Sequence, residues 1–466
     1  MAITLSLFGD VAVDMDLRGI SIDSRTIQPG ELFAAVRGER FDGHDFIGQA
    51  VAAGCAAVLV DRPLPVTPPV PVVVVNDVLH AMSTAARQWR RQVNPLVLAV
   101  TGSCGKTTVK EMLTRCLQQR FAVVHATRGN FNNHIGLPLT LLAMPDHCQA
   151  LVVELGMSGA GEITHLAGLA EPRIGIVTNV MPAHLEAFAS VEAIVEAKGE
   201  LLEALPADGL AIIPAGQTCT ARLRQKAGAV KVLTFGLDDT ADVYSLTNAP
   251  PPDEEGPGPG TTTAAATPFM IHWQAAQDAI KTCLAQHGAH LRLNALAVAA
   301  AARAAGVSPA QIAAGLDNFA PPPGRGGIRQ APQGWRVVDD SYNANPGSVQ
   351  AALRALPEPR HPGRRIAVLG DMLELGKEAE LLHRELRQAV LANGITLLFT
   401  AGPLMASLHQ AVQEAGSPIA AWHRPDPAQW LGHIAPHLHP EDVVLVKGSR
   451  GMKMERIVEN LVSNAL

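Results

Sequence analysis

The sequence is poor in basic charge, closely spaced cysteines and long hydrophobic runs. Lys and Arg number 37 against 43 Asp and Glu, and this net charge of -6 argues against a protein that coats nucleic acid or an anionic membrane. The six cysteines form no CxxC pair, so we expect reduced thiols rather than a disulfide framework or a zinc site. No run reaches about 18 uninterrupted apolar residues and no basic leader opens the chain, so we expect a cytoplasmic protein without stable membrane insertion.

The composition is that of a globular protein with several cores. Hydrophobic residues make up 47% and charged residues 17% of 466 positions, and about 150 residues per domain suggests roughly three domains. Strand and helix patterns alternate, which predicts an α/β fold with largely parallel sheets. We predict a small N-terminal α/β domain (1–82), a central P-loop parallel-sheet ATPase domain (83–318) and a C-terminal Rossmann-like domain (319–466). The segment 248–268, rich in Pro, Gly and Thr, predicts a flexible surface insertion.

The strongest local signal is the segment 100–108, which reads Val-Thr-Gly-Ser-Cys-Gly-Lys-Thr-Thr. An apolar strand precedes it and a helical pattern follows, so its glycine turn and helix N-terminus can surround a phosphate. Lys106 supplies a positive charge to the terminal phosphates, and the Thr107 hydroxyl can ligate Mg²⁺. The residues predicted to bind a nucleotide are Thr101, Gly102, Ser103, Cys104, Gly105, Lys106, Thr107 and Thr108.

Two further predicted strands end in polar side chains. The strand of segment 151–156 ends at Glu154, and the strand that leads into segment 178–186 is followed by His184. Because the carboxyl ends of parallel strands face one crevice, both side chains are expected near the phosphate loop. Magnesium prefers oxygen ligands, so Glu154 is the better metal candidate, and His184 alone is also consistent with a packed or capping histidine. Judged by charge pattern alone, Lys198 is a solvated helix cation.

Three polar segments follow predicted strands in the C-terminal part. Segment 339–346, Asp-Asp-Ser-Tyr-Asn-Ala-Asn-Pro, suits recognition of ribose or phosphate, although an Asn-Pro turn with nearby acids is the alternative. Segment 370–376, Gly-Asp-Met-Leu-Glu-Leu-Gly, likewise comes directly after a predicted strand. Lys447, Arg450 and Lys453 follow the last strand and can hold a carboxylate or phosphate, or form a solvated basic turn.

Together these segments resemble the Mur ligase family. The resemblance rests on TGSCGKTT, the strand ending in Glu154, NVMPAHLEAF, EAKGE, DDSYNANP, GDMLELG and KGSRGMKME, and on DSRTIQPGELFAAVRGERFDGHDF near the N-terminus. It spans about residues 20 to 458 and leaves 248–268 outside. Within the family, the residues of these motifs are most similar to those of members that join D-alanyl-D-alanine to UDP-N-acetylmuramoyl-tripeptide.

The resemblance implies the activity of an ATP-dependent ligase. Such a ligase makes the UDP-muramoyl-pentapeptide precursor of peptidoglycan through an acyl phosphate and releases ADP and phosphate. A related Mur ligase, or a folylpolyglutamate synthetase, that adds another amino acid is the alternative. The N-terminal domain is then expected to bind the UDP substrate, the central domain ATP, and the C-terminal domain to complete the ligase. We expect a monomer that binds no nucleic acid.

The resemblance also reverses the interpretation of Lys198. In this family the lysine of the EAKGE segment is carbamylated, and the resulting anion helps to bind a second Mg²⁺. For two Mg²⁺ ions, the implied ligands are Thr107, Glu154, His184 and carbamylated Lys198. The implied catalytic residues are Lys106, Glu154, His184 and Lys198.

Other positions are matched to nucleotide and substrate. Asn294, Arg325 and Asp340 correspond to positions associated with ATP. Leu291 stands where relatives often have asparagine, which weakens the inference about adenine contacts. The residues implied to contact the muramoyl substrate or D-alanyl-D-alanine are Ser24, Asn130, Asn133, Asn345, Lys447 and Arg450.

Overall fold

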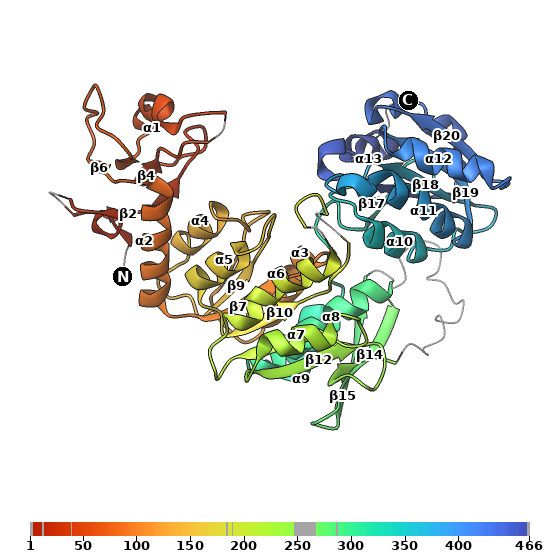
Figure 1. Cartoon of the computed structure of the whole chain (residues 1–466), viewed down its shortest axis with the longest axis horizontal. Helices are drawn as coiled ribbons and strands as arrows, with labels where there is room; N and C mark the ends of the chain where they lie inside the picture. Colours follow the sequence, from red (N-terminus) through yellow and green to blue (C-terminus); the bar gives the residue numbers. More distant parts are fainter. Residues whose placement is uncertain are drawn as a thin grey trace.

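The computed structural model describes residues 3–11, 14–38, 40–182, 185–188, 190–246, 267–285 and 288–463. Three main sheets follow one another along these residues, each covered by helices, and the central part lies between the N-terminal and C-terminal parts (Figure 1). This confirms the predicted three-domain α/β fold. None of the helices in the described part of the chain has the length and apolar character that a bilayer crossing requires.

The N-terminal part is built on a parallel sheet of four strands in the order β3-β4-β5-β6, beside a short antiparallel pair, β1-β2. Its strands are β1 (Ile3–Thr4), β2 (Asp16–Leu17), β3 (Gly19–Ser21), β4 (Glu31–Ala34), β5 (Ala57–Val60) and β6 (Val72–Val74). Its helices are η1 (Leu5–Phe8), η2 (Gly43–Phe46), α1 (Ile47–Ala52) and α2 (Val78–Val93). Strand β3 ends at Ser21, and the Asp23 carbonyl then accepts from the Thr26 and Ile27 amides and closes a turn.

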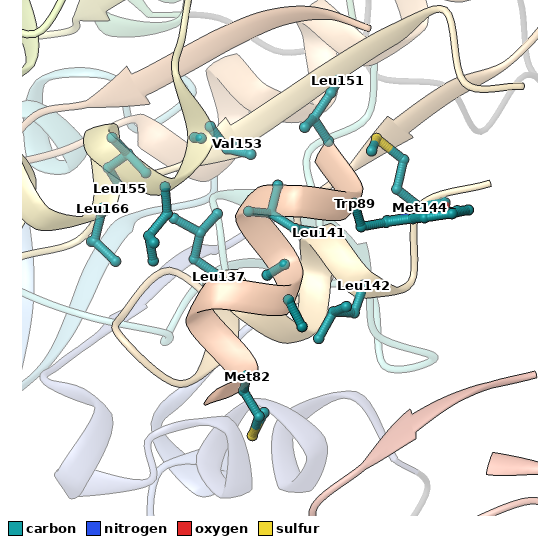
Figure 2. Close-up of a cluster of buried hydrophobic side chains, with 14 of the residues drawn as sticks. Met82, Trp89, Leu137, Leu141, Leu142, Met144, Leu151, Val153, Leu155 and Leu166 are labelled. Atoms are coloured by element: carbon teal, nitrogen blue, oxygen red, sulfur yellow. The ribbon is translucent and has the colours of Figure 1, made fainter. Parts of the chain in front are cut away.

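Helix α2 connects the N-terminal and central parts. The Asp77 side chain caps its start, and its buried face carries Met82 and Trp89. The Trp89 indole N–H donates to the Met144 carbonyl at 2.9 Å, and both side chains pack in the cluster around helix α4 (Gly136–Leu142) that Figure 2 shows. The predicted boundary after residue 82 therefore lies inside one continuous helix.

The central part contains a nine-stranded sheet in the order β15-β14-β13-β12-β11-β10-β7-β9-β8. Its strands are β7 (Leu96–Thr101), β8 (Val124–Ala126), β9 (Ala150–Glu154), β10 (Ile174–Val177), β11 (Leu210–Pro214), β12 (Lys231–Gly236), β13 (Val243–Tyr244), β14 (Thr267–Trp273) and β15 (Asp278–Leu284). Neighbours from β8 to β13 are parallel. The antiparallel hairpin β14-β15 adds an edge that the parallel prediction did not include.

Helices cover both faces of this sheet. One face packs against α3 (Lys106–Gln118), α8 (Ala289–Ala304) and α9 (Pro309–Leu316). The other packs against α4, α5 (Glu162–Ala170), α6 (Val191–Glu203) and α7 (Thr220–Ala227). The expected insertion at 248–268 lies outside the described residues, except for its last two positions in β14.

The C-terminal part is a six-stranded sheet in the order β16-β17-β21-β18-β19-β20, in which β16 alone is antiparallel to its neighbour. Its strands are β16 (Gly327–Gln330), β17 (Arg336–Asp340), β18 (Arg365–Gly370), β19 (Ile395–Ala401), β20 (Ala420–Arg424) and β21 (Val443–Lys447). Its helices are α10 (Pro346–Arg354), η3 (Gly376–Glu378), α11 (Ala379–Ala392), α12 (Met405–Glu414), η4 (Pro427–Trp430), η5 (Ala435–His437), η6 (Arg450–Met452) and α13 (Glu455–Val462). Helices α10 to α12 cover one face and α13 the other, as in a doubly wound domain.

Candidate active site

Three neighbouring strands of the central sheet bring the predicted polar residues together. Strand β7 lies between β9 and β10, and Val100 is in register with Glu154 while Thr101 is in register with Val177. The phosphate loop, Glu154 and the segment after β10 therefore leave the sheet at one edge, as predicted.

Two glycines let the phosphate loop approach its neighbours. Gly102 and Gly105 have φ angles of +151° and +83°. A Cβ atom on Gly102 would lie 1.9 Å from the Thr178 hydroxyl, and one on Gly105 would lie 2.7 Å from the Asn294 amide oxygen. A larger residue at either position would therefore displace the loop. The second contact places Asn294, which is buried in α8, directly beneath the loop.

The segment after β10 holds this loop in place. The Thr178 hydroxyl donates to the Cys104 carbonyl at 2.5 Å, and Asn179 bonds both the Cys104 amide and carbonyl. The Ser103 hydroxyl donates to the Met181 carbonyl at 3.0 Å. Sequence reasoning took only His184 from this segment and missed Thr178 and Asn179, although polar residues directly after a buried strand were a usable signal. His184 itself lies outside the described residues.

The remaining polar residues of the loop do not all face the same way. The Thr101 hydroxyl is turned inward and donates to the Leu155 carbonyl at 2.9 Å, so its side chain is structural. Thr108 is also buried, in the first turn of α3. The first four amides of a helix have no acceptor within it, so the backbone at the start of α3 can receive an anion.

Lys106, Thr107 and Glu154 lie together at this edge. The Lys106 ammonium donates to the Gly102 carbonyl at 2.8 Å, and burial lowers its pKa although the charge of Glu154 opposes that shift. The Thr107 hydroxyl donates to Glu154 at 2.9 Å and accepts from Arg325 at 3.0 Å. Glu154 is only 2% exposed. A hydroxyl and a buried carboxylate in contact are oxygen donors of the kind that Mg²⁺ prefers, so these residues fit such an ion.

Asn132 is a site residue that the sequence analysis missed. Its amide donates to the second oxygen of Glu154 at 2.8 Å, so both carboxylate oxygens are held. Its predicted neighbours have other positions: the Asn133 side chain accepts from the Gly136 amide at the start of α4, and Asn130 is exposed. The three asparagines of this loop were visible in the sequence, but nothing in their spacing says which one turns toward the glutamate.

Lys198 is a buried residue of α6, 2% exposed, and the interpretation as a solvated cation is wrong. Burial and the nearby Lys106 charge hold its pKa well below the ordinary value. No hydrogen bond or ion pair joins its Nζ to another residue in the described ranges. The adjacent acids point elsewhere, since Glu196 pairs with Arg222 and Glu200 accepts from amides at the start of α5.

The C-terminal part contacts the phosphate loop directly. The Asn345 amide donates to the Cys104 Sγ at 3.1 Å, while its oxygen caps α10. The Arg325 guanidinium, already bonded to Thr107, lies 3.9 Å from the centre of the Tyr342 ring, and Arg450 lies 5.2 Å from it. Residues nearly 250 positions apart thus meet at one site.

Lys447 is a paired cation. It is 3% exposed and donates to Asp340 at 2.6 Å and to the Asn343 carbonyl at 2.8 Å. Arg450 and Lys453 lie exposed on the following turn. The alternative of a solvated basic turn is therefore wrong for Lys447, because this side chain is buried and paired with Asp340, and its role in holding an anion stays a prediction.

A cleft separates α8 from the C-terminal sheet. Its apolar lining includes Leu291, Ile328 and Val338, and Arg325 and Asp340 stand among its polar residues. His290 also lines it, and burial lowers the pKa of this imidazole. An apolar floor with a carboxylate at one end can take a flat base that carries a polar sugar.

Ser24, a predicted site residue, stands apart from this assembly. It lies in the N-terminal part, where its hydroxyl donates to Gln49 at 2.9 Å. Figure 1 places the N-terminal and C-terminal sheets on different sides of the central part.

Comparison with known proteins identifies the family. Residues 16–93 match the model described as "Mur ligase family, catalytic domain", 100–302 the "Mur ligase middle domain" and 324–450 the "Mur ligase, glutamate ligase domain". The chain is 35% identical to the UDP-N-acetylmuramoyl-tripeptide--D-alanyl-D-alanine ligase of Bacillus subtilis, over 97% of this chain and 94% of the relative. It is also 35% identical to that of Escherichia coli, over 100% and 99%. The chain belongs to the Mur ligase family.

Solved Mur ligases have the same arrangement. A crystal structure of MurF from Acinetobacter baumannii superposes with a TM-score of 0.84 at 30% identity, covering 97% of this chain and 94% of that one. MurF from Thermotoga maritima in complex with ADP superposes with a TM-score of 0.80 at 27% identity, covering 98% of both chains. The likeness therefore includes all three sheets of this Mur ligase rather than the central part alone.

Proposed function

We propose that this chain is the Mur ligase that joins D-alanyl-D-alanine to UDP-N-acetylmuramoyl-tripeptide, with ATP converted to ADP and phosphate. The proposal rests on two contacts between the C-terminal part and the phosphate loop. Arg325 contacts Thr107, and Asn345 contacts Cys104, so one site is formed by the phosphate loop and a second domain. The names of full-length relatives support the choice of substrates.

The nucleotide would lie between the loop and the C-terminal sheet. The backbone amides at the start of α3 and the Lys106 ammonium would hold the phosphates. Arg325 would contact the terminal phosphate, because its guanidinium already reaches Thr107. The cleft lined by Leu291 and Asp340 would take the adenosine, with Asp340 toward the ribose and Asn294 supporting the loop.

Magnesium binding would use the oxygen donors of this edge. Thr107 and Glu154 would serve a first ion, and Glu154, His184 and a carbamylated Lys198 would serve a second. Such ions, when bound, reduce the charge repulsion between phosphate oxygens and the attacking carboxylate. Asn132 would keep Glu154 turned toward the site, since it bonds the oxygen that Thr107 leaves open.

Carbamylation of Lys198 is supported by its surroundings. A carbamate forms on a neutral amine, and a buried amine without a counter-charge favours the neutral form. The added carboxylate would then supply the anionic oxygens that an ammonium lacks. Lys198 can therefore enter the metal site only after it loses its positive charge.

The reaction needs protection from water. ATP supplies the phosphoryl group that converts the tripeptide carboxylate into an acyl phosphate, which the amine of D-alanyl-D-alanine attacks. The contacts of Asn345 and Arg325 with the loop would cover this intermediate and prevent its hydrolysis. Asn130 and Asn133, which flank the Asn132 that holds Glu154, would contact the substrate from the central domain. Lys447 and Arg450 would contact it from the C-terminal domain. Ser24 would contact the uridine nucleotide held by the N-terminal domain.

The remaining expectations follow from this role. The domains 1–82, 83–318 and 319–466 would bind the UDP substrate, bind ATP and complete the ligase, respectively. The product would feed peptidoglycan synthesis, and through it cell shape and division. We propose a cytoplasmic monomer that binds no nucleic acid.

The test is phosphate release by the purified chain. With ATP, Mg²⁺ and UDP-muramoyl-tripeptide, release should depend on D-alanyl-D-alanine, and the product mass should equal that of the pentapeptide. Parallel reactions replace the dipeptide with single amino acids and the tripeptide with shorter muramoyl peptides or folate. Turnover with one of these, but not with D-alanyl-D-alanine, would assign the chain to another ligase of the same class.

A further inference from the structure

A second set of titratable side chains lies on the C-terminal part, away from the phosphate loop. It surrounds a surface hollow at β20, the edge strand of the six-stranded sheet. We call it the β20 hollow, and the side chains that line it include His409, Trp422, His423, Arg424, His433 and His437. Four histidines around one hollow have no part in the proposed ligase reaction.

Two of these histidines face each other across two elements. His409 comes from α12 and His423 from β20, and their ring centres are 5.8 Å apart with an angle of 34° between the planes. Two imidazoles that share a metal ion through bonds of about 2.0–2.1 Å have ring centres about 5–6 Å apart. A shared ion is therefore compatible with the spacing of these two rings.

The hydrogen bonds of His423 leave one nitrogen available. The Thr400 hydroxyl lies 3.1 Å from the Trp422 carbonyl, to which it donates, and 3.1 Å from His423 Nδ1. Because the hydroxyl proton is used, Thr400 accepts from Nδ1–H, and the lone pair of His423 is then on Nε2. A second residue that fixes the tautomer in this way is typical of histidine metal ligands.

One ring nitrogen of His409 has no hydrogen-bond partner among the described residues. Its Nδ1 atom is buried and makes no hydrogen bond in the described part of the chain. Buried polar atoms of native proteins nearly always have a partner, and an ion or a water is the usual explanation when no side chain supplies one.

We propose that His409 and His423 bind a divalent transition-metal ion of the Zn²⁺ type. Within the described residues no group of three or more His, Cys, Asp or Glu side chains is arranged to hold a metal, so the site has two protein ligands and water completes the coordination. Imidazole nitrogen selects Zn²⁺, Ni²⁺ or Cu²⁺ over Mg²⁺, so this site is distinct from the proposed nucleotide-metal site. The ion would join α12 to the edge strand.

Zinc binding to the tag-free, full-length chain tests the proposal. Zn²⁺ is titrated in competition with a chromophoric chelator, with Mg²⁺ in excess so that oxygen-ligand sites are filled. We expect one equivalent bound, and a loss of affinity of about tenfold or more in His409→Gln and in His423→Gln. His439→Gln, an exposed histidine of the same domain that does not line the hollow, is the matched control and should bind as the unchanged chain does.

A third variant separates the metal site from a folding defect. Thr400→Val keeps both histidines but removes the hydroxyl that orients His423, and it should weaken Zn²⁺ binding about tenfold. All variants should keep the basal ligase turnover, which shows that they are folded. Zn²⁺ binding that is absent from the unchanged chain, or that is the same in His409→Gln and His423→Gln, would overturn the proposal.

Discussion

Two buried lysines lie at the polar edges of the two larger sheets, and their surroundings are opposite. Lys447 ends β21 and donates to the Asp340 carboxylate at 2.6 Å. Lys198, on α6 beside the phosphate loop, has no described partner and lies near the Lys106 cation. Because a buried ammonium needs a counter-charge, Asp340 compensates the burial of Lys447, whereas the surroundings of Lys198 favour its neutral form. The same residue type thus has two opposite electrostatic environments.

The largest effect should come from removing the cation beside Lys198. Lys106→Ala takes away the charge that faces the phosphates, and turnover should fall by about 10³-fold. Phosphate release measures the loss, and circular dichroism checks the fold. The matched control is Lys231→Ala, which removes an exposed cation of the same domain outside the proposed site and should stay close to normal. Near-normal turnover of Lys106→Ala would remove this loop from the active site.

A slightly smaller effect is expected from changing Lys198 itself. Lys198→Ala and Lys198→Arg should both lose about 10²-fold or more, because neither side chain can become a carboxylate ligand. Lys198→Glu should keep more activity than Lys198→Ala, limited by its shorter reach. Stripping bicarbonate should lower the activity of the unchanged chain, and its mass should include one CO₂ on Lys198. Full activity of Lys198→Arg would mean that Lys198 is not a metal ligand and acts only as a structural cation.

The stability of the two sites should respond in opposite ways to an apolar replacement. Lys447→Met leaves Asp340 without its partner and should cost about 2 kcal/mol in the free energy of unfolding of the C-terminal domain, since Asp340 is partly exposed. Lys198→Met removes a buried amine that has no partner, so it should be neutral or stabilising. Urea unfolding measures both, followed by the C-terminal tryptophans for Lys447 and by circular dichroism for Lys198. Equal costs at the two positions would contradict the comparison.

The smallest effect is a pH dependence of stability, measured without CO₂ or Mg²⁺. The pKa of Lys198 in the folded chain lies well below 10.5, its ordinary value in the unfolded chain. Between these two values the unfolded chain binds more protons, so this lysine makes stability rise with pH. The gain in unfolding free energy from Lys198→Met should therefore shrink as pH approaches 10.5. A difference that stays constant with pH would mean that Lys198 titrates alike in both states.

Much of the site was predictable because parallel strands bring their carboxyl ends to one edge. That rule places the phosphate loop and Glu154 together from the sequence alone. It could not tell that Asn132, rather than Asn130 or Asn133, holds the glutamate, because three adjacent residues of a loop point in directions that only packing decides. It also could not give the end of β3 at Ser21, which the turn at Asp23 sets.

The sequence by itself determined the α/β class, the order of the three domains and the family, since these follow from hydrophobic periodicity and from motifs read along the chain. The tertiary structure alone decided which polar residues are buried and what each one faces. Charge pattern made Lys198 a solvated cation and left a solvated turn open for Lys447, and the solvated interpretation failed at both positions for the same reason. Whether a lysine is charged depends on its access to solvent and on a nearby counter-charge, and residues distant in the chain decide both. Asp340 supplies the counter-charge for Lys447, and the core around α6 excludes solvent from Lys198.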